Sequence, residues 1–245
     1  GTFQRGRLRA SLLVTQVALS VVLLFGAGLF VRSLRNVRAI DLGFDADRLL
    51  MASVDLPREG YTTERRNALY RDMMARVTAL PGIEGAAVAV TSPFYSSISL
   101  DLSIPGRDSL PDLSTGSPNM NAVTPDFFRT MGLELKRGRT FTEADGATSE
   151  RVAVVNEAMA SYGWPGEEAV GKCFRVGADT TPCIQVVGIV EDQVNHGVQD
   201  PPIPFYYLPL DQSSGRYPMR SLFVRTAAEP SAMLDRALEL PEQVA

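Results

Sequence analysis

The longest apolar run of the chain extends from Ala10 to Val31 and predicts a membrane-spanning helix. It holds 22 uncharged residues between Arg9 and Arg32, of which 13 are Leu, Val or Phe. A helix of that length is about 33 Å long, close to the roughly 30 Å of the hydrocarbon core. A buried helix of a soluble protein usually carries a polar stripe, and a cleaved signal peptide has a shorter apolar region that ends at small residues. Both alternatives fit this run less well than a membrane span.

The residues after the span predict a stalk. No helix breaker occurs from Arg32 to Ala39, so the helix is expected to continue for about two turns beyond the lipid before Asp41 and Gly43 end it. This stalk would carry Arg32, Arg35 and Arg38.

The next part of the chain has the pattern of a β-α-β unit. Arg48 to Asp55 predicts a strand, and Thr62 or Thr63 can cap a helix that reaches Leu80. Ile83 to Thr91 predicts a second strand. The apolar stripe of the helix consists of Leu69, Met73, Val77 and Leu80.

Residues 91–120 are rich in Ser, Pro, Asp and Gly and predict a boundary or an excursion into a second lobe. The elements expected from there on are a strand at Ser99–Ile104, a short helix from Pro125, a strand at Arg151–Val155, a helix capped by Asn156 and closed by Gly163 and Pro165, strands at Lys172–Val176, Cys183–Val190, Phe205–Leu208 and Ser221–Thr226, and a final helix from Pro230 toward Leu240. This order predicts a mixed α/β body whose first and last parts pair, with the middle inserted between them.

Charge is divided unevenly between these parts. The whole chain has a net charge of −4, but residues 1–38 hold six Arg and no acid, which leaves −10 for residues 39–245. An acidic body repels phosphate backbones, so no nucleic acid is expected as a partner. Three Arg precede the span and three follow it, so the positive-inside rule does not choose an orientation. The acidic body is compatible with export, and the chain opens at Gly1 without Met, as expected for part of a longer protein.

The two cysteines predict a disulfide. Cys173 and Cys183 lie at mirrored positions about the predicted turn Gly177-Ala178-Asp179, which would place them opposite each other on adjacent strands. An exported location favours their oxidation. A two-Cys metal site would need further soft ligands, and His196 is the chain's one histidine.

No catalytic constellation is visible. The string from Gly166 to Cys173 differs from the phosphate-binding loop motif at one position, where Cys173 replaces Ser or Thr. A helix is expected before it and a strand after it, the reverse of the order in that motif. His196 in a polar loop is more typical of a surface residue than of a ligand, and Trp164 more typical of core packing. We therefore predict no enzyme, no cofactor and no metal site.

Two stretches resemble the MacB/FtsX-type ABC transporter permeases, whose outer part is the MacB-like periplasmic core domain. The first, from Val14 to Leu34 with Gly43-Phe44-Asp45, is similar to the membrane helix that begins the second half of duplicated permeases. The second consists of Val123-Thr124-Pro125-Asp126-Phe127-Phe128, Met131-Gly132, Gly138-Arg139, Phe141-Thr142, Asp145, Val154-Val155-Asn156-Glu157, Trp164-Pro165-Gly166, Gly171-Lys172 and Val186 to Asp192.

The resemblance implies an α+β fold in which the transmembrane helix is followed by a two-lobed extracytoplasmic domain. Residues 1–40 would be a cytoplasmic basic arm, span and stalk. Residues 41–105 and 201–245 would form a β-α-β porter-like lobe, and residues 106–200 an inserted mixed α/β lobe.

The same resemblance implies a role in the bacterial inner (plasma) membrane, with the main domain extracytoplasmic. The implied partners are the lipid bilayer, a separate ABC ATPase subunit, a second permease unit and a periplasmic adaptor. The stalk with Arg32, Arg35 and Arg38 would couple ATPase motion to export or to other extracytoplasmic work. An extracytoplasmic sensor domain of a membrane receptor is the first alternative, and a membrane-tethered hydrolase is the second.

Overall fold

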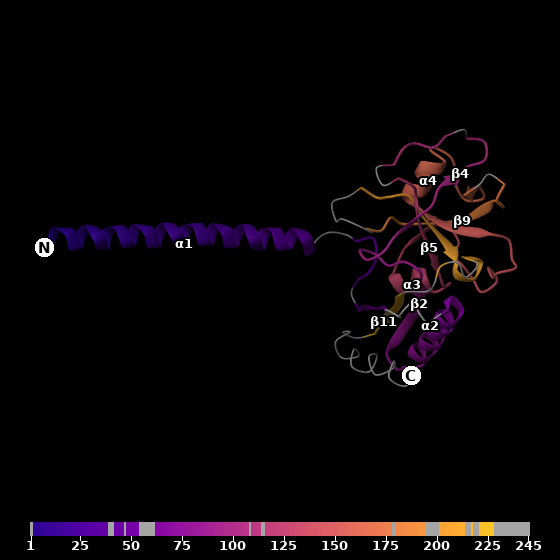
Figure 1. Cartoon of the computed structure of the whole chain (residues 1–245), viewed down its shortest axis with the longest axis horizontal. Coiled ribbons are helices and arrows are strands. Elements are labelled where there is room, and N and C mark those ends of the chain that lie inside the picture. Colours follow the sequence, from indigo (N-terminus) through magenta and orange to yellow (C-terminus); the bar gives the residue numbers. More distant parts are fainter. Residues whose placement is uncertain are drawn as a thin grey trace. The chain divides into compact units, whose positions relative to one another are not determined.

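The computed structural model describes residues 2–38, 42–46, 48–53, 62–107, 109–113, 116–177, 180–194, 201–213, 217 and 221–227. The chain divides into two compact units, Gly1–Asp41 and Leu42–Ala245. We call the second unit the body. Figure 1 shows both units.

The first unit is the long helix α1 (Thr2–Arg38), which runs for 37 residues without interruption. The described side chains from Ser11 to Val37 are exposed, and among the described residues this is the one helix long and apolar enough to cross a membrane. The prediction that the helix continues past Arg32 is confirmed as far as Arg38. Ala39 to Asp41, where the helix was expected to end, lie outside the described residues.

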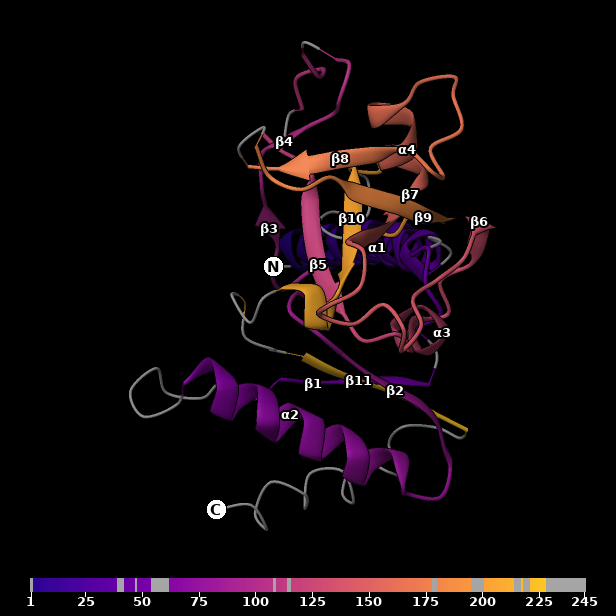
Figure 2. The same ribbon diagram turned by 90° about the vertical axis from the view of Figure 1, so that its right-hand side faces the viewer.

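The body is built on a mixed sheet of 11 strands in the order β1-β11-β2-β5-β10-β7-β9-β8-β4, with β3 beside β5 and β6 beside β9. The strands are β1 (Leu49–Ser53), β2 (Ile83–Ala89), β3 (Ile98–Ser99), β4 (Leu102–Ser103), β5 (Asn119–Val123), β6 (Leu135–Gly138), β7 (Val152–Asn156), β8 (Cys173–Val176), β9 (Ile184–Val190), β10 (Phe205–Pro209) and β11 (Ser221–Thr226). Figure 2 shows β1, β11 and β2 together at one end of the body and β8 and β9 toward the other.

The predicted pairing of the first and last parts of the body is confirmed. β1 and β2 are both antiparallel to β11, which lies between them. They are therefore parallel to each other, as a β-α-β unit requires. β2 joins the next strands through a single pair, Ala89 with Val123. The predicted lobe boundaries, after residues 105 and 200, stay predictions. β10, from the part of the chain after residue 200, lies between β5 and β7 in the sheet.

Side-chain caps begin the two longer helices of the body. Thr62 accepts a hydrogen bond from the Arg65 N–H ahead of α2 (Thr63–Thr78), at 3.3 Å. Asn156 accepts one from the Met159 N–H ahead of α4 (Glu157–Gly163), at 2.9 Å. Both caps satisfy N–H groups that the first helical turn leaves without a partner. The remaining helices are α3 (Phe127–Met131) and the 3₁₀ turn η1 (Leu210–Ser213).

The sheet has an apolar layer on each face, because side chains alternate between the two faces of a strand. Val88 on β2 and Tyr206 on β10 belong to the layer covered by α2 and α4. Their neighbours Ala87 and Tyr207 belong to the opposite layer, which includes α3. Continuous apolar runs such as Val152–Val155 are explained by this double coverage.

Two strands, β5 and β6, were not predicted. β5 contains Asn119 and Asn121, and β6 contains Lys136 and Gly138; Asn, Gly and, to a lesser degree, Lys are depleted in strands. The single strand expected at Ser99–Ile104 is replaced by the two short strands β3 and β4. The final helix expected toward Leu240 falls outside the described residues.

Candidate functional site

The first described residues after α1, Leu42 to Ala46, are held against the body by hydrogen bonds and close packing. We call them the docked segment. Leu42 O accepts a hydrogen bond from the Val194 N–H at 2.9 Å, and the Asp45 N–H donates to Met131 O at 3.0 Å. The docked segment therefore contacts the loop after β9 at one end and the C-terminus of α3 at the other.

Gly43 packs against the backbone of the loop after β9. Its φ is +67°, and a Cβ added to it would lie 1.9 Å from the carbonyl oxygen of Asp192. Both the backbone conformation and the contact require glycine. The chain at this point therefore lies directly on Asp192.

Phe44 is half-buried against the apolar layer that contains α3. That layer is rich in aromatic rings in contact: the Phe127 ring centroid lies 5.6 Å from that of Phe223 and 5.9 Å from that of Tyr207. Phe44 thus adds an apolar contact to the polar contacts on either side of it.

Asp45 is joined to Arg225 on β11. Arg225 Nη1 donates to Asp45 Oδ2 and Nη2 donates to Asp45 O, both at 2.7 Å, while Nε donates to Thr130 O, also at 2.7 Å. The Arg225 side chain is only 10% exposed. A buried guanidinium is tolerated because its donors have partners, and Asp45 supplies the countercharge. Asp45 also packs against Gly132, where an added Cβ would lie 2.9 Å from that of Asp45.

The loop on which Gly43 lies is connected in turn to α4. The Asp192 carboxylate accepts a hydrogen bond from the Ala158 N–H in the first turn of α4, at 2.9 Å. Burial raises the pKa of Asp192, the hydrogen bond from Ala158 opposes that rise, and the nearby Glu157 carboxylate adds to it. A displacement of Gly43 would therefore act on a residue that accepts a hydrogen bond from the first turn of α4.

A second ion pair stabilises the loop between β6 and β7. Arg139 donates two hydrogen bonds to the Asp145 carboxylate at 2.7 and 2.9 Å, and the Thr142 N–H donates a third at 2.8 Å. The hydrogen bond from Arg139 lowers the pKa of Asp145, the bonds from Thr142 lower it further, and burial opposes them. The Asp145 side chain is only 7% exposed.

The structure joins Cys173 and Cys183 by a disulfide, with their Cα atoms 5.7 Å apart. The predicted register was wrong, however. Cys173 on β8 pairs with Gln185 on β9, and Phe174 pairs with Ile184. The cysteines are therefore diagonal rather than directly opposite, because the connection between the strands extends two residues further on the β9 side.

The other residues considered in the sequence have ordinary structural places. The loop from Gly166 to Lys172 follows α4 and precedes β8, as expected for a turn, and the Gly171 N–H donates to Val186 O at 2.8 Å. Trp164 is buried in the core. Arg32 and Arg35 are exposed on α1, and His196 lies outside the described residues. No group of three or more His, Cys, Asp or Glu that could hold a metal ion occurs among the described residues.

Sequence reasoning missed the role of Arg225 altogether. The signal was present as a charged residue inside the apolar strand Ser221–Thr226, since a charge in a buried strand needs a partner. Its partner, Asp45, was noted only as part of the Gly43-Phe44-Asp45 resemblance. Nothing local to either residue indicates that the two would meet.

A long apolar helix, a docked segment and a mixed sheet with an apolar layer on each face define an α/β domain preceded by a helix long and apolar enough to cross a membrane. The family model of the MacB-like periplasmic core domain matches residues 11–239. The chain therefore belongs to the MacB-like periplasmic core domain family. It is an extracytoplasmic-type domain of an ABC transporter permease, and the predicted resemblance to MacB-type permeases is confirmed.

Individual relatives agree with this assignment. The Macrolide export ATP-binding/permease protein MacB 2 of Aeromonas hydrophila subsp. hydrophila is 26% identical over 157 residues, which are 62% of this chain and 24% of that protein. The chain thus spans about a quarter of the relative's length.

Two solved structures share the fold. The periplasmic region of MacB from Actinobacillus actinomycetemcomitans superimposes with a TM-score of 0.58 at 18% identity, over 82% of this chain and 86% of that one. The extracellular domain of the noncanonic ABC-type transporter YknZ from Gram-positive bacteria gives 0.50 at 14% identity, over 78% and 87%. At these identities the likeness is one of fold alone.

Proposed function

We propose that this chain forms a membrane span and the extracytoplasmic core of an ABC transporter permease, and that the docked segment passes movement of α1 to the body. The span would cross the bacterial inner (plasma) membrane with the body outside the cytoplasm. A separate ABC ATPase subunit would supply the motion, a second permease unit would complete the transporter, and a periplasmic adaptor would meet the body. The output would be export or other extracytoplasmic work.

The observation that carries the proposal is the ion pair between Asp45 and the buried Arg225. A lever acts on a domain only if its end is fixed to that domain. Gly43 on Asp192, Phe44 in the apolar layer and Asp45 on Arg225 fix three successive residues to three different places in the body.

The second requirement is a stiff connection. α1 has no break from Thr2 to Arg38, and a continuous helix resists bending because each turn is hydrogen-bonded to the next. We assign the stalk role to the part that carries Arg32, Arg35 and Arg38. Its charge would place it outside the hydrocarbon core.

The role of the stalk is tested by substitutions that make the helix less rigid and leave its length unchanged. Replacing Asn36 and Val37 together by Gly should abolish transport-coupled ATP turnover in the full transporter, because two glycines weaken the helix by about 2 kcal/mol relative to two alanines. The matched control replaces the same two residues by Ala and should retain coupling. Insertion of Gly-Gly between Arg32 and Ala39 should have the same effect as the glycine pair. Equal coupling in the glycine and alanine variants would refute a rigid stalk.

The ATPase partner is tested separately. The full-length protein should copurify with a soluble ABC ATPase from the same cell, and ATP hydrolysis by the purified complex should depend on the permease. Purification of the intact, folded protein without any ATPase would argue against the assignment to a transporter.

A further inference from the structure

A groove on the surface of the body lies between β6 and α4, and it encloses about 210 Å³. Lys136 and Arg137 line it from β6, Glu157 and Ala160 line it from α4, and the buried Trp164 lines it directly after α4. Figure 2 shows β6 beyond β9 at the edge of the sheet. We call this hollow the β6–α4 groove. Its two sides belong to different elements, so its width depends on how those elements are held.

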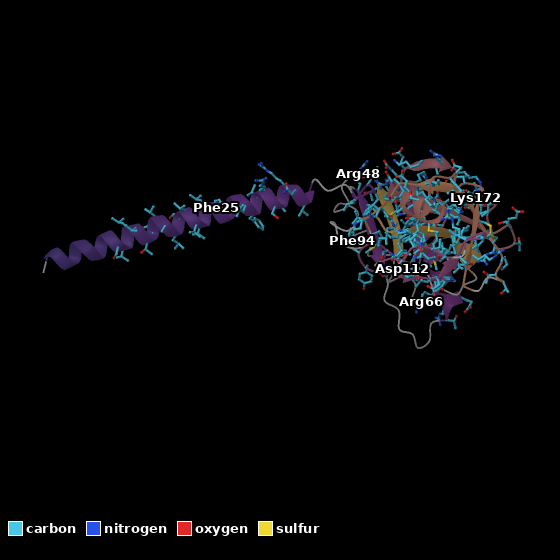
Figure 3. All side chains as sticks on the ribbon, turned by 90° about the horizontal axis from the view of Figure 1, so that it is seen from above. Phe25, Arg48, Arg66, Phe94, Asp112 and Lys172 are labelled. Atoms are coloured by element: carbon cyan, nitrogen blue, oxygen red, sulfur yellow. A yellow bond between two sulfur atoms is a disulfide. The ribbon has the colours of Figure 1, made fainter. Side chains whose placement is uncertain are left out.

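The contacts across the β6–α4 groove are weak ones. Arg137 on β6 donates to Glu168 in the turn after α4, Nη1 to Oε2, at 2.5 Å, and both side chains are exposed. Within the same turn Lys172, labelled in Figure 3, pairs with Glu167 at 2.9 Å. Exposed ion pairs contribute little to stability. The pair of Arg137 with Glu168 therefore does not fix the width of the groove.

The loop after β9 holds both sides of the β6–α4 groove. The Asp192 carboxylate accepts a hydrogen bond from the Ala158 N–H in the first turn of α4, at 2.9 Å. The Glu191 N–H donates to Glu134 O at 3.0 Å, and the Glu134 N–H donates to Glu191 Oε1 at 2.7 Å. Glu134 directly precedes β6. Two neighbouring residues of one loop thus hold the start of α4 and the start of β6.

The docked segment lies on this same loop. Leu42 O accepts from the Val194 N–H at 2.9 Å, and Gly43 packs so closely that an added Cβ would lie 1.9 Å from Asp192 O. Asp192 therefore contacts the docked segment through its backbone and α4 through its side chain. A shift of Gly43 relative to α4 strains one of these two contacts.

We propose that the position of the docked segment sets the width of the β6–α4 groove through residues 191–194. The docked segment keeps the loop in place, and the loop keeps the starts of α4 and β6 at their present separation. Displacement of the docked segment releases the loop, the pair of Arg137 with Glu168 yields, and the groove widens. Asp192 and Glu191 are then positioning residues. The proposal rests on the proposed function, because it names where movement passed to the body reaches its surface.

The test measures alkylation of a cysteine in the groove of the full permease. Ala160→Cys places a thiol on α4 at a partly buried position of the lining, and the native Cys173 and Cys183 are joined to each other. Gly43→Ala should raise the rate of alkylation about tenfold, the factor that corresponds to docking weakened by about 1.4 kcal/mol. An unchanged rate overturns the proposal.

Two controls separate this effect from general loosening. Gly106→Ala has the same backbone strain, but nothing lies within 4 Å of its added Cβ, so it should leave the rate unchanged. Met73→Ala removes buried packing on α2 and lowers the stability of the body away from the loop. It should also leave the rate close to that of the wild type. A rise in Met73→Ala equal to that in Gly43→Ala overturns the proposal.

A double-mutant cycle tests the route through Asp192. Asp192→Ala removes the acceptor for the Ala158 N–H, whereas Asp192→Asn keeps a side-chain oxygen there. The effect of Gly43→Ala on the Ala160→Cys rate should persist in Asp192→Asn and disappear in Asp192→Ala. A tenfold effect that persists in Asp192→Ala overturns the assigned route.

The coupling should also act in the reverse direction, because linkage between two sites is reciprocal. A short bifunctional maleimide that joins Arg137→Cys to Glu168→Cys should slow proteolysis around residue 43 by about fivefold or more, the low end of typical couplings. The same reagent across Asp72→Cys and Arg76→Cys, an exposed pair on α2, is the control and should not slow it. Equal protection by both cross-links, or none by the first, overturns the proposal.

None of these measurements uses nucleotide or an ATPase. A groove that responds to the docked segment, together with a transporter that does not couple, would count against the proposed function alone. Normal coupling with a groove that does not respond would count against this inference alone.

Discussion

Arg225 and Asp45 are 180 positions apart in the sequence, yet two hydrogen bonds of 2.7 Å join them. One residue lies on β11, near the end of the described chain, and the other lies four residues before β1. The pair therefore fastens the docked segment to β11, the strand between β1 and β2. It links the first described residues after α1 to the core of the body.

Loss of the Asp45 carboxylate should destabilise the body. Asp45→Ala leaves the Arg225 guanidinium buried with one acceptor fewer, at a cost of about 2 kcal/mol, below the full value for a buried pair because Asp45 is half exposed. Urea unfolding of the detergent-solubilised chain measures this change. The control is Asp72→Ala, which breaks the exposed pair with Arg76 on α2 and should cost less than about 0.5 kcal/mol. Equal effects of the two variants would contradict a structural role for the buried pair.

Gly43→Ala should loosen the docked segment. The new Cβ would lie 1.9 Å from Asp192 O, so the backbone must move in addition to the strain of a positive φ. Gly106→Ala is a matched control, because Gly106 has a φ of +85° and nothing within 4 Å of an added Cβ. We expect the free energy of unfolding to fall by about 1 kcal/mol in the control and by at least about 2 kcal/mol in Gly43→Ala.

Proteolysis around residue 43 gives a second measure of the same displacement. Cleavage should be faster in Gly43→Ala than in either the wild type or the Gly106→Ala control. If Gly43→Ala and Gly106→Ala are equally stable and equally resistant, the close approach to Asp192 has no energetic weight.

The disulfide should stabilise the fold by about 2 to 3 kcal/mol, since it closes a loop of about ten residues in the unfolded chain. Reduction or Cys173→Ser should lower the free energy of unfolding, measured in urea, by that amount, and reduction should change the Cys173→Ser variant no further. Alkylation of the unreduced protein should label neither Cys173 nor Cys183. Labelling of both thiols in protein isolated from its native compartment would refute the bond.

The Asp145 ion pair predicts a loss of stability in acid. The pKa of Asp145 is lowered mainly by the hydrogen bond from Arg139. Its contribution is therefore fully present above the unfolded-state pKa of about 3.9 and is lost as the pH falls through the lower folded-state value. Asp145→Asn should cost about 1 to 3 kcal/mol at pH 7. The gap between wild type and variant, followed by denaturant titration, should close as the pH is lowered below about 4, and a pH-independent gap would contradict this account.

For Asp192 we expect the opposite dependence of stability on pH. Burial raises its pKa, so its ionised form is disfavoured in the folded state, and this penalty is relieved as the pH falls through the folded-state value. Asp192→Asn removes the charge and keeps a side-chain oxygen that can accept the hydrogen bond from the Ala158 N–H. The variant should match or exceed the wild type in thermal stability at pH 7. Any advantage should vanish in acid, and a clear loss at pH 7 would show that the charge itself is needed.

Features that depend on short stretches of chain could be predicted from the sequence. The apolar run from Ala10 to Val31 is sufficient for a helix, because its length and composition suit only a few environments. Thr62 and Asn156 mark helix starts because capping is a contact over three residues. The pairing of the first and last parts of the body followed from the order of the elements, and membership of the family followed from motifs spread along the chain.

The tertiary structure alone decided which distant residues meet. Asn121 is of a residue type that is rare in strands. Its hydrogen bonds with the backbone of Val90 and Thr91 explain why its amide is buried in β5. The predicted turn at Gly177-Ala178-Asp179 gave the wrong cysteine register, and only the observed pairing of β8 with β9 decided it. Arg225 finds Asp45 because β11 enters the sheet beside β1, and no local pattern encodes that approach. Helix starts and strands depend on neighbouring residues, whereas contacts across the sheet depend on how the whole body packs.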